Sequence, residues 1–407
     1  MSLTKIVETD AREVVVPATT FAQYARAMEL GESIPSSIVE LIGSDPTPYQ
    51  VLQHLVPRTE RRERGTFFTS SSTANSLWGD AIDSIKPGAV VVDPACGAGD
   101  LLWPAAGRIS DSNLTDVILR ACDVDQDFTR VAAARLRQVI GAEHEAVEGL
   151  TADFLVDASS VADATHVVLN PPFVPIVVEE PWASGRVNAA AVFTIRALQA
   201  MQPGARLLAV LPDVLRSGSR YSAWRDTVAG LASLNRIEVH GVFDEQTDVH
   251  VFILDATVGN EPSRASWNPP MSESTLKDYA DIRVGPVVPH RDSEDGPVSQ
   301  YVTARSLSSG EKLVRGFSGR KENGPFILVN RTSRPGESPR VRARQWTDPE
   351  DVAVENHLLI IAPKDGVSVS DVLKVLESDE TADFLDNRIR CRHLTVRALK
   401  EIPWPAY

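Results

Sequence analysis

The stretch Val91-Val92-Asp93-Pro94-Ala95-Cys96-Gly97-Ala98-Gly99-Asp100-Leu101-Leu102 combines three structural signals. An apolar strand ends at an acid, a turn with two glycines follows, and an apolar helix begins. Glycines at a strand-to-helix turn allow a ligand to touch the backbone. The acid distinguishes this turn from the Gly-x-Gly-x-x-Gly phosphate cradle, and it favours a nucleoside ligand whose amino acid tail carries an ammonium group. The pattern therefore predicts an α/β fold that binds a ligand at this turn.

Apolar strands and helices alternate from about residue 85 to residue 258. The expected strands span residues 89–93, 117–123, 146–153, 165–170, 206–212, 236–242 and 249–256, and the expected helices span residues 100–109, 126–140, 188–201 and 219–231. This alternation predicts a mainly parallel sheet that is covered by helices. The last two strands are separated by a short turn, so we expect them to form an antiparallel hairpin. Ligands of such sheets bind at the carboxyl ends of the strands.

Acidic side chains also stand at the ends of the second and third expected strands. Asp123 is placed to accept hydrogen bonds from two ribose hydroxyls, as the acid after the second strand of dinucleotide folds does. Asp125 is better explained as a helix cap. Asp153 is placed to accept from an adenine amino group while Phe154 packs on the ring, although an Asp at a strand end is also ordinary turn chemistry.

The tetrapeptide Asn170-Pro171-Pro172-Phe173 directly follows the fourth expected strand. An adenine amino group is a poor nucleophile because its lone pair is delocalised into the ring. Two acceptors on its hydrogens, the Asn170 side-chain oxygen and the Pro171 carbonyl, favour a pyramidal nitrogen with a localised lone pair. Phe173 is then expected to stack on the base and to stabilise the developing positive charge. A base in a duplex must swing out of the stack to reach such a pocket. A Pro-rich turn that closes a strand is the alternative.

These motifs resemble those of the N6-adenine DNA methyltransferases of bacterial restriction–modification systems, over roughly residues 60–258. The segment from Asp93 to Gly99 is similar to their Asp-Pro-Ala-Cys-Gly-Ser-Gly, with Ala98 in place of Ser. The resemblance implies an α/β fold with the seven-stranded, Rossmann-like sheet of S-adenosylmethionine-dependent methyltransferases. It also implies S-adenosylmethionine as the cofactor, with contacts from Thr69, Asp93, Ala95, Gly97, Asp123, Asp153 and Phe154. The acid at position 123 is more often Glu in that family.

Two of the implied contacts have alternatives. Residues 65–70 resemble the segment that closes over the methionine end of the cofactor, with Thr69 as the matching contact and Ser70 in place of the usual Pro. The hydroxyls of residues 69–73 independently predict a helix start. Phe243 resembles a second aromatic residue that packs against the extruded base, and a Phe of the hydrophobic core is the alternative.

The charge distribution divides the chain. The net charge is −14, which argues against indiscriminate nucleic-acid binding, but residues 301–347 carry ten basic and three acidic side chains. We expect an N-terminal helical segment (1–56), a methyltransferase catalytic domain (57–258) and a C-terminal α+β domain (259–407) that resembles DNA recognition domains in style. DNA contacts are expected from Arg331, Arg334, Arg340, Arg342 and Arg344. A solvated surface is the alternative.

Several classes of protein are disfavoured. No apolar run approaches the ~20 residues of a membrane span. The first residues lack the apolar core of a signal peptide, so a cytoplasmic location is expected. The three cysteines are far apart and match neither a disulfide framework nor a metal site, and no metal is expected.

The sequence therefore predicts a site-specific, adenine-specific DNA methyltransferase. It would act on double-stranded DNA as the modification enzyme of a restriction–modification system, with or without a separate restriction endonuclease. A protein glutamine or RNA methyltransferase is the main alternative, because an amide or base nitrogen needs the same two acceptors. Those enzymes are usually smaller and lack a large basic C-terminal domain. A non-catalytic DNA-binding subunit predicts a damaged motif, and none is damaged. N4-cytosine enzymes more often carry Ser at position 170.

Overall fold

A computed structural model describes residues 4–9, 12–17, 20–42, 54–56, 69–141, 146–244, 247–268, 272–390 and 392–405. The chain divides into two compact units. Unit 1 comprises Met1–Leu215 and Ser219–Ser266, and unit 2 comprises Arg216–Gly218 and Trp267–Tyr407. Each unit is described by itself.

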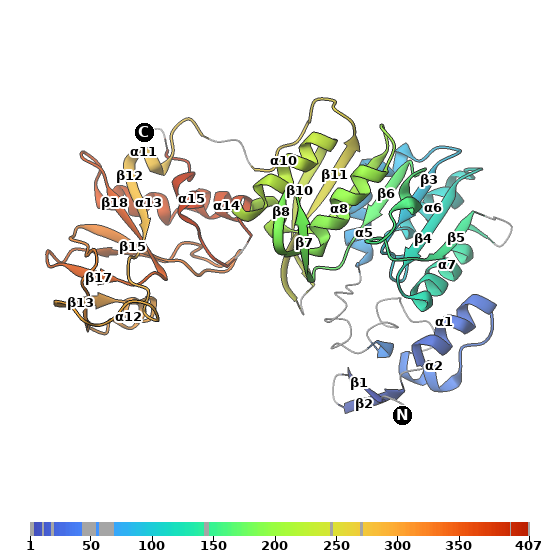
Figure 1. The fold of residues 1–407 in the computed structure, drawn as a ribbon, viewed down its shortest axis with the longest axis horizontal. Coiled ribbons are helices and arrows are strands. Elements are labelled where there is room, and N and C mark those ends of the chain that lie inside the picture. Colours follow the sequence, from blue (N-terminus) through green and yellow to red (C-terminus); the bar gives the residue numbers. More distant parts are fainter. Residues whose placement is uncertain are drawn as a thin grey trace. The chain divides into compact units, whose positions relative to one another are not determined.

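A seven-stranded sheet forms the centre of unit 1 (Figure 1). Its order is β10-β11-β9-β6-β3-β4-β5, and only β11 runs antiparallel to its neighbours. The strands are β3 (Val90–Asp93), β4 (Ile118–Asp123), β5 (Val147–Thr151), β6 (His166–Leu169), β9 (Arg206–Pro212), β10 (Ala232–Asp244) and β11 (Thr247–Val258). After β5 the chain returns to the other side of β3, so the strand order reverses between β3 and β6. Ligands of open α/β sheets bind at such a point.

Helices cover the sheet because its central strands are apolar on both faces. The connecting helices are α6 (Trp103–Ser112), α7 (Gln126–Ile140), α8 (Ala189–Ala200) and α10 (Ser222–Leu231). Helix α5 (Ser71–Trp78) and the 3-10 turn η1 (Gly79–Ser84) precede β3 and share one core with α6, α7 and the sheet. The remaining short elements are η2 (Ser159–Val161), α9 (Asp213–Ser217) and η3 (Ser219–Tyr221).

All seven strands and all four helices that were expected in this unit are present. The helix expected at 100–109 begins only at Trp103, because the preceding residues continue the glycine turn. The largest feature of this unit that was not predicted is a two-stranded hairpin of β7 (Pro175–Glu180) and β8 (Ala183–Asn188), which immediately follows the Asn-Pro-Pro-Phe tetrapeptide. Most of its residues are exposed or half-buried, its first strand begins with Pro175, and its turn lacks an Asn-Gly or Asp-Gly pair.

The N-terminal part contains both helices and strands. Helices α1 (Thr20–Leu30) and α2 (Ser36–Ile42) were predicted, whereas the antiparallel pair β1 (Thr4–Thr9) and β2 (Arg12–Pro17) was not. Tyr24 and Ala25 of α1 pack on Phe128 and Val131 of α7. Most of residues 43–68 lies outside the described residues, so the expected helical segment (1–56) is tested only in part.

Unit 2 contains two sheets and a set of helices. The four-stranded sheet has the order β12-β18-β15-β16, and the three-stranded sheet has the order β14-β13-β17. The strands are β12 (Ala280–Val284), β13 (Val298–Val302), β14 (Leu313–Gly316), β15 (Phe326–Asn330), β16 (Ala343–Trp346), β17 (Val352–Val354) and β18 (Leu358–Pro363). The helices are α11 (Leu276–Tyr279), α12 (Ala304–Ser309), α13 (Val369–Leu376), α14 (Asp379–Arg388) and α15 (Val396–Lys400). Helices α13, α14 and α15 share a core with β12, β15 and β18.

Within the described ranges, no helix is both long and apolar enough to span a bilayer.

Candidate active site

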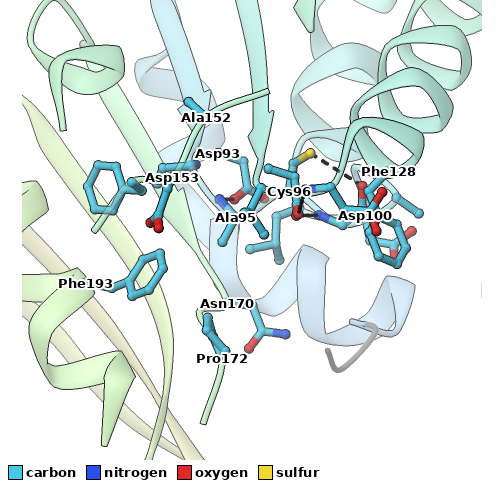
Figure 2. Close-up of a pocket in the computed structure, with 18 of the residues that line it drawn as sticks. Asp93, Ala95, Cys96, Asp100, Phe128, Ala152, Asp153, Asn170, Pro172 and Phe193 are labelled. Atoms are coloured by element: carbon cyan, nitrogen blue, oxygen red, sulfur yellow. Dashed lines mark hydrogen bonds between the residues drawn. The ribbon is translucent and has the colours of Figure 1, made fainter. Parts of the chain in front are cut away.

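A pocket of about 680 Å³ lies at the carboxyl ends of β3, β4, β5 and β6 (Figure 2). Its volume falls within the range of small-molecule sites. The pocket lies at the point where the strand order of the sheet reverses. Its lining comes from the glycine turn after β3, from the acids that follow β4 and β5, and from the residues that follow β6.

The glycine turn is held rigidly against β4. Asp93 is 1% exposed, and its Oδ1 accepts a hydrogen bond from the Ala95 amide at 3.0 Å. The Gly97 amide donates to Asp123 Oδ2 at 3.0 Å. Gly97 and Gly99 both have positive φ, and a Cβ on Gly99 would lie 3.1 Å from Cβ of Ala132 in α7. Glycine is therefore required where α7 approaches the turn.

Asp123 uses both of its carboxylate oxygens to organise the turn. Oδ2 accepts from Gly97, and Oδ1 accepts from the amide of Asp125 at 3.0 Å. A carboxylate has about four lone-pair sites, so each oxygen retains capacity for a ligand hydroxyl. Asp125 caps α7 by accepting from the Asp127 amide at 2.9 Å. The expectation of a helix cap at Asp125 is confirmed.

Three carboxyl groups of the pocket are held in conditions that disfavour their charge. Burial raises the pKa of Asp93 well above its usual value, and the nearby Asp123 and Asp100 raise it further. Burial also raises the pKa of Asp123, against the hydrogen bonds from backbone amides. Burial also raises the pKa of Asp100, whereas its ion pair with Arg135, at 3.0 Å, lowers it. A cationic ligand would stabilise the ionised forms of all three groups.

The side of the pocket that follows β5 is aromatic. Asp153 is exposed, and its Oδ1 accepts from the Leu155 amide at 2.9 Å. Phe154 is buried, and its ring stacks on Phe193 of α8 with centroids 5.3 Å apart. Phe193 was not predicted, because a Phe inside a helix carries no signal that separates a pocket wall from a core position. Asp100 was missed for a related reason, since the first turn of a helix often carries an acid.

Asn170 brings the fourth motif into the same pocket. Asn170 and Pro172 line it together with Asp93, Asp123 and Asp153. The Asn170 Nδ2 donates to Thr69 Oγ1 at 2.9 Å, and Thr69 also lines the pocket.

The expected helix start beside Thr69 is confirmed. Ser70 is the N-cap of α5, and its hydroxyl accepts from the Thr73 amide at 3.1 Å. Residues 65–68 of the implied closing segment lie outside the described residues.

Pro171 and Phe173 are placed differently from Asn170. Pro171 is buried and Phe173 is half-buried, and neither belongs to the lining of this pocket. Phe173 packs against the core, and its ring lies edge-on to Phe243, with centroids 6.0 Å apart and planes at 71°. The two predicted base-stacking residues are therefore neighbours. They contact each other, so a base cannot lie between them in this arrangement.

The predicted DNA contacts in unit 2 separate into two groups. Arg334, Arg342 and Arg344 are exposed and Arg331 is half-buried, and for these four residues the DNA contact stays a prediction. For Arg340 the prediction is wrong. Arg340 is 1% exposed, and its Nε donates to Asp386 Oδ1 at 2.6 Å. A buried, ion-paired guanidinium cannot reach a phosphate.

Comparison with known proteins supplies one relative by sequence and several similar structures. No family model matches the chain. The chain is 22% identical over 384 residues to "Modification methylase CviBIII" of Paramecium bursaria Chlorella virus NC1A. The alignment covers 85% of this chain and 95% of that protein. The order of the seven strands, with β11 antiparallel, agrees with the seven-stranded sheet that the motif resemblance implies. The resemblance to modification methyltransferases, drawn from the motifs, is confirmed by this relative.

Two solved structures illustrate the similarity. The type IIG restriction endonuclease BpuSI aligns with a TM-score of 0.49 and 13% identity, over 95% of this chain and 70% of that one. The M protein of the type I restriction enzyme EcoKI aligns with a TM-score of 0.38 and 19% identity, over 59% and 54% of the two chains.

The pocket fits S-adenosylmethionine, the cofactor that the motif resemblance implies. Its volume suits a nucleoside with an amino acid tail, and its buried carboxyls suit the positive charges of the ammonium and sulfonium groups. The glycine turn leaves the backbone open to the ligand. No group of side chains in the described part of the chain is arranged to hold a metal ion.

Proposed function

We propose that this protein transfers a methyl group from S-adenosylmethionine to the N6 amino group of adenine in a specific double-stranded DNA sequence. It would act as the modification enzyme of a restriction–modification system. One observation carries the proposal: Asn170 shares a single pocket with Asp93, Asp123 and Asp153. A group that engages an amino nitrogen therefore lies beside the acids expected to hold the cofactor.

Five residues are assigned to the cofactor. Asp123 accepts from the ribose hydroxyls, Asp153 accepts from the adenine amino group, and Phe154 packs on the ring. Asp93 and the backbone at Gly97 hold the methionine end. When bound, the cofactor supplies an electrophilic methyl group on a sulfonium centre.

Asn170 and Pro171 are assigned to the substrate amino group. The Asn170 Nδ2 is engaged by Thr69, so the amide presents its acceptor oxygen to an incoming amino group. With the Pro171 carbonyl as second acceptor, the nitrogen becomes pyramidal and its lone pair localises. The nitrogen gains a methyl group and releases its proton to water, so no side chain is needed as a base.

Phe173 and Phe243 are assigned to the extruded base. Their edge-on contact buries part of both rings. A base swung out of the duplex would stack on one of them or separate the pair. Either event places aromatic surface next to a ring that becomes cationic during transfer.

The test is a nucleoside analysis of DNA from cells that produce the full chain. We expect N6-methyladenine with the natural chain and none with Asn170→Ala. Methylation confined to cytosine N4, to RNA or to a protein glutamine would overturn the proposal.

A further inference from the structure

Three segments of unit 2 meet beside the end of β15: residues 330–334, residues 355–357, and residue 390 with residues 392–394, together called the three-loop cluster. Backbone hydrogen bonds join them. The Arg331 amide donates to the His357 carbonyl at 3.0 Å, and the Leu394 amide donates to the Arg331 carbonyl at 2.7 Å. Thr332 and His393 form an antiparallel bridge. Side chains that are far apart in the sequence therefore share one surface.

The three-loop cluster is basic in an acidic protein. Its segments contain four arginines and two histidines against one acid, Glu355. The exposed members are Arg334, His357, Arg392 and His393. The basic run at 301–347 contains only the first segment, so the arginines at 390 and 392 did not enter the sequence prediction. This concentration of positive charge matches a polyanion such as DNA.

Polar atoms that lack a hydrogen-bond partner in the described part of the chain lie within the three-loop cluster. The side chains of Asn330, Arg331 and Asn356 are half-buried, and one atom of each, Asn330 Oδ1, Arg331 Nε and Asn356 Oδ1, is covered and has no hydrogen-bond partner among the described residues. Unmatched buried polar groups are unfavourable, and in native proteins they usually mark a place for water or a ligand. Arginine and asparagine are the side chains that pair with the edges of guanine and adenine. The cluster therefore combines charge with capacity for base recognition.

Buried Arg340 explains how the loops are held. Its Nη1 donates to the Ser333 carbonyl at 3.0 Å, and its Nη2 donates to the Ile389 carbonyl at 3.3 Å. Asp386 pairs with its Nε and also accepts from the Gly336 amide at 2.7 Å. Arg340 thus ties the first loop to the segment that leads into the third. It is a positioning residue for the cluster.

We propose that the three-loop cluster is the surface that reads double-stranded DNA. Arg331, Asn330 and Asn356 contact base edges, and Arg334 and Arg392 contact phosphates on either side. The inference rests on the proposed function and names the part of unit 2 that serves it. Phosphate contacts fix position without carrying sequence information, whereas base contacts specify the sequence. Substitutions of the phosphate-contacting residues should therefore weaken binding to every sequence, whereas substitutions of the base-contacting residues should change the sequence preference.

The first test measures binding of the full chain to a fluorescent duplex of random sequence over a range of salt concentrations. We expect Arg334→Ala with Arg392→Ala to weaken binding and to reduce the slope of log affinity against log salt by about two, because each phosphate contact contributes about 0.9. The matched control is Arg305→Ala with Arg320→Ala, which removes two exposed arginines outside the cluster. An equal loss in the control, or an unchanged slope in the first variant, would overturn the proposal. This test does not depend on methylation.

The second test maps methylated positions in genomic DNA from cells that produce each variant. With Arg331→Ala we expect a relaxed motif, with discrimination at one position reduced about ten- to a hundredfold. With Arg334→Ala we expect the same motif at lower extent. An unchanged motif in both Arg331→Ala and Asn356→Ala contradicts the base-reading assignment. If the natural chain methylates no adenine, the proposed function fails instead, and the salt test alone decides the inference.

Discussion

The pocket of unit 1 and the three-loop cluster of unit 2 have opposite physical characters. The pocket is concave and its buried carboxyls have raised pKa values, so it suits a small cation. The cluster carries exposed arginines and histidines, so it suits a large polyanion. This separation teaches how a chain with a net charge of −14 can act on DNA. Because the chain as a whole is acidic, attraction to DNA depends on local basic surfaces such as this cluster.

The largest effect is expected from Arg340→Ala. Removing the guanidinium leaves Asp386 without its buried partner and also removes the hydrogen bonds to the carbonyl and hydroxyl of Ser333 and to the Ile389 carbonyl. Breaking a buried pair costs about 3–5 kcal/mol. Denaturant unfolding of unit 2 should shift by that amount, while cofactor affinity of unit 1 stays unchanged. Arg342→Ala is the matched control, because its pair with Glu337 is exposed and contributes at most about 1 kcal/mol. Loss of cofactor affinity in Arg340→Ala would show that the two regions are not independent.

The second effect separates two functions within the pocket. Asn170→Ala should reduce methyl transfer about a thousandfold, roughly 4 kcal/mol, since it removes a polar group that acts in the transition state. The dissociation constant of S-adenosylmethionine, measured by calorimetry, should change by less than about threefold. Asp123→Ala should show the reverse pattern, with cofactor binding weakened first. A parallel fall of rate and cofactor affinity in Asn170→Ala would remove the distinction between the two residues.

How far each region could be predicted follows from how it is encoded. Asp93, Asp123, Asp153 and Asn170 each stand directly after an apolar strand, so local sequence places them at one edge of the sheet. The central strands β3, β6 and β9 were predicted for the same reason, because buried strands give continuous apolar runs. Only the order of the strands requires the structure. Phe193 could not be predicted, because its place in the pocket depends on how α8 lies on the sheet.

The three-loop cluster shows the opposite case. Its segments are joined by tertiary backbone pairing, which leaves no periodic signal in the sequence. Arg340 and Arg342 are two residues apart, and the sequence alone does not distinguish them. One is buried against Asp386 and the other is exposed, although residues two apart in a regular strand would face the same side, because the chain is irregular at residues 340–342 before β16 begins. Charge counting over a window therefore could not separate the structural Arg340 from the exposed arginines.

A third prediction concerns a buried histidine at the start of β6. Burial lowers the pKa of His166 from 6.5 to about 4, and the positive charge of Arg206 contributes. The folded state therefore takes up a proton less readily than the unfolded state. Its contribution to stability is complete above pH 6.5 and is lost as the pH falls to about 4, by up to about 3 kcal/mol. The raised pKa of Asp93 has the opposite effect, because its contribution to stability increases as the pH falls.

The comparison with His166→Gln isolates the histidine. Denaturant unfolding at pH 7 and at pH 4.5 should show a larger loss of stability in the natural chain than in the variant. The His166 Nε2 lies 2.8 Å from the Ser84 hydroxyl, a contact that glutamine can retain. Equal losses in the two proteins would mean that His166 titrates normally.

The smallest effect decides to which side of the pocket Thr69 belongs. The resemblance assigns Thr69 to the methionine end of the cofactor, whereas its hydroxyl accepts a hydrogen bond from Asn170. Thr69→Val keeps the shape and removes the hydroxyl. If the hydroxyl orients the Asn170 amide, kcat at saturating cofactor should fall several-fold, corresponding to the roughly 1 kcal/mol of one hydrogen bond. The dissociation constant of the cofactor should then stay nearly constant, and Thr69→Ser should restore the rate. The reverse result, with weaker cofactor binding and a normal kcat, would place Thr69 with Asp93 among the cofactor ligands and leave Asn170 to be oriented by its own loop.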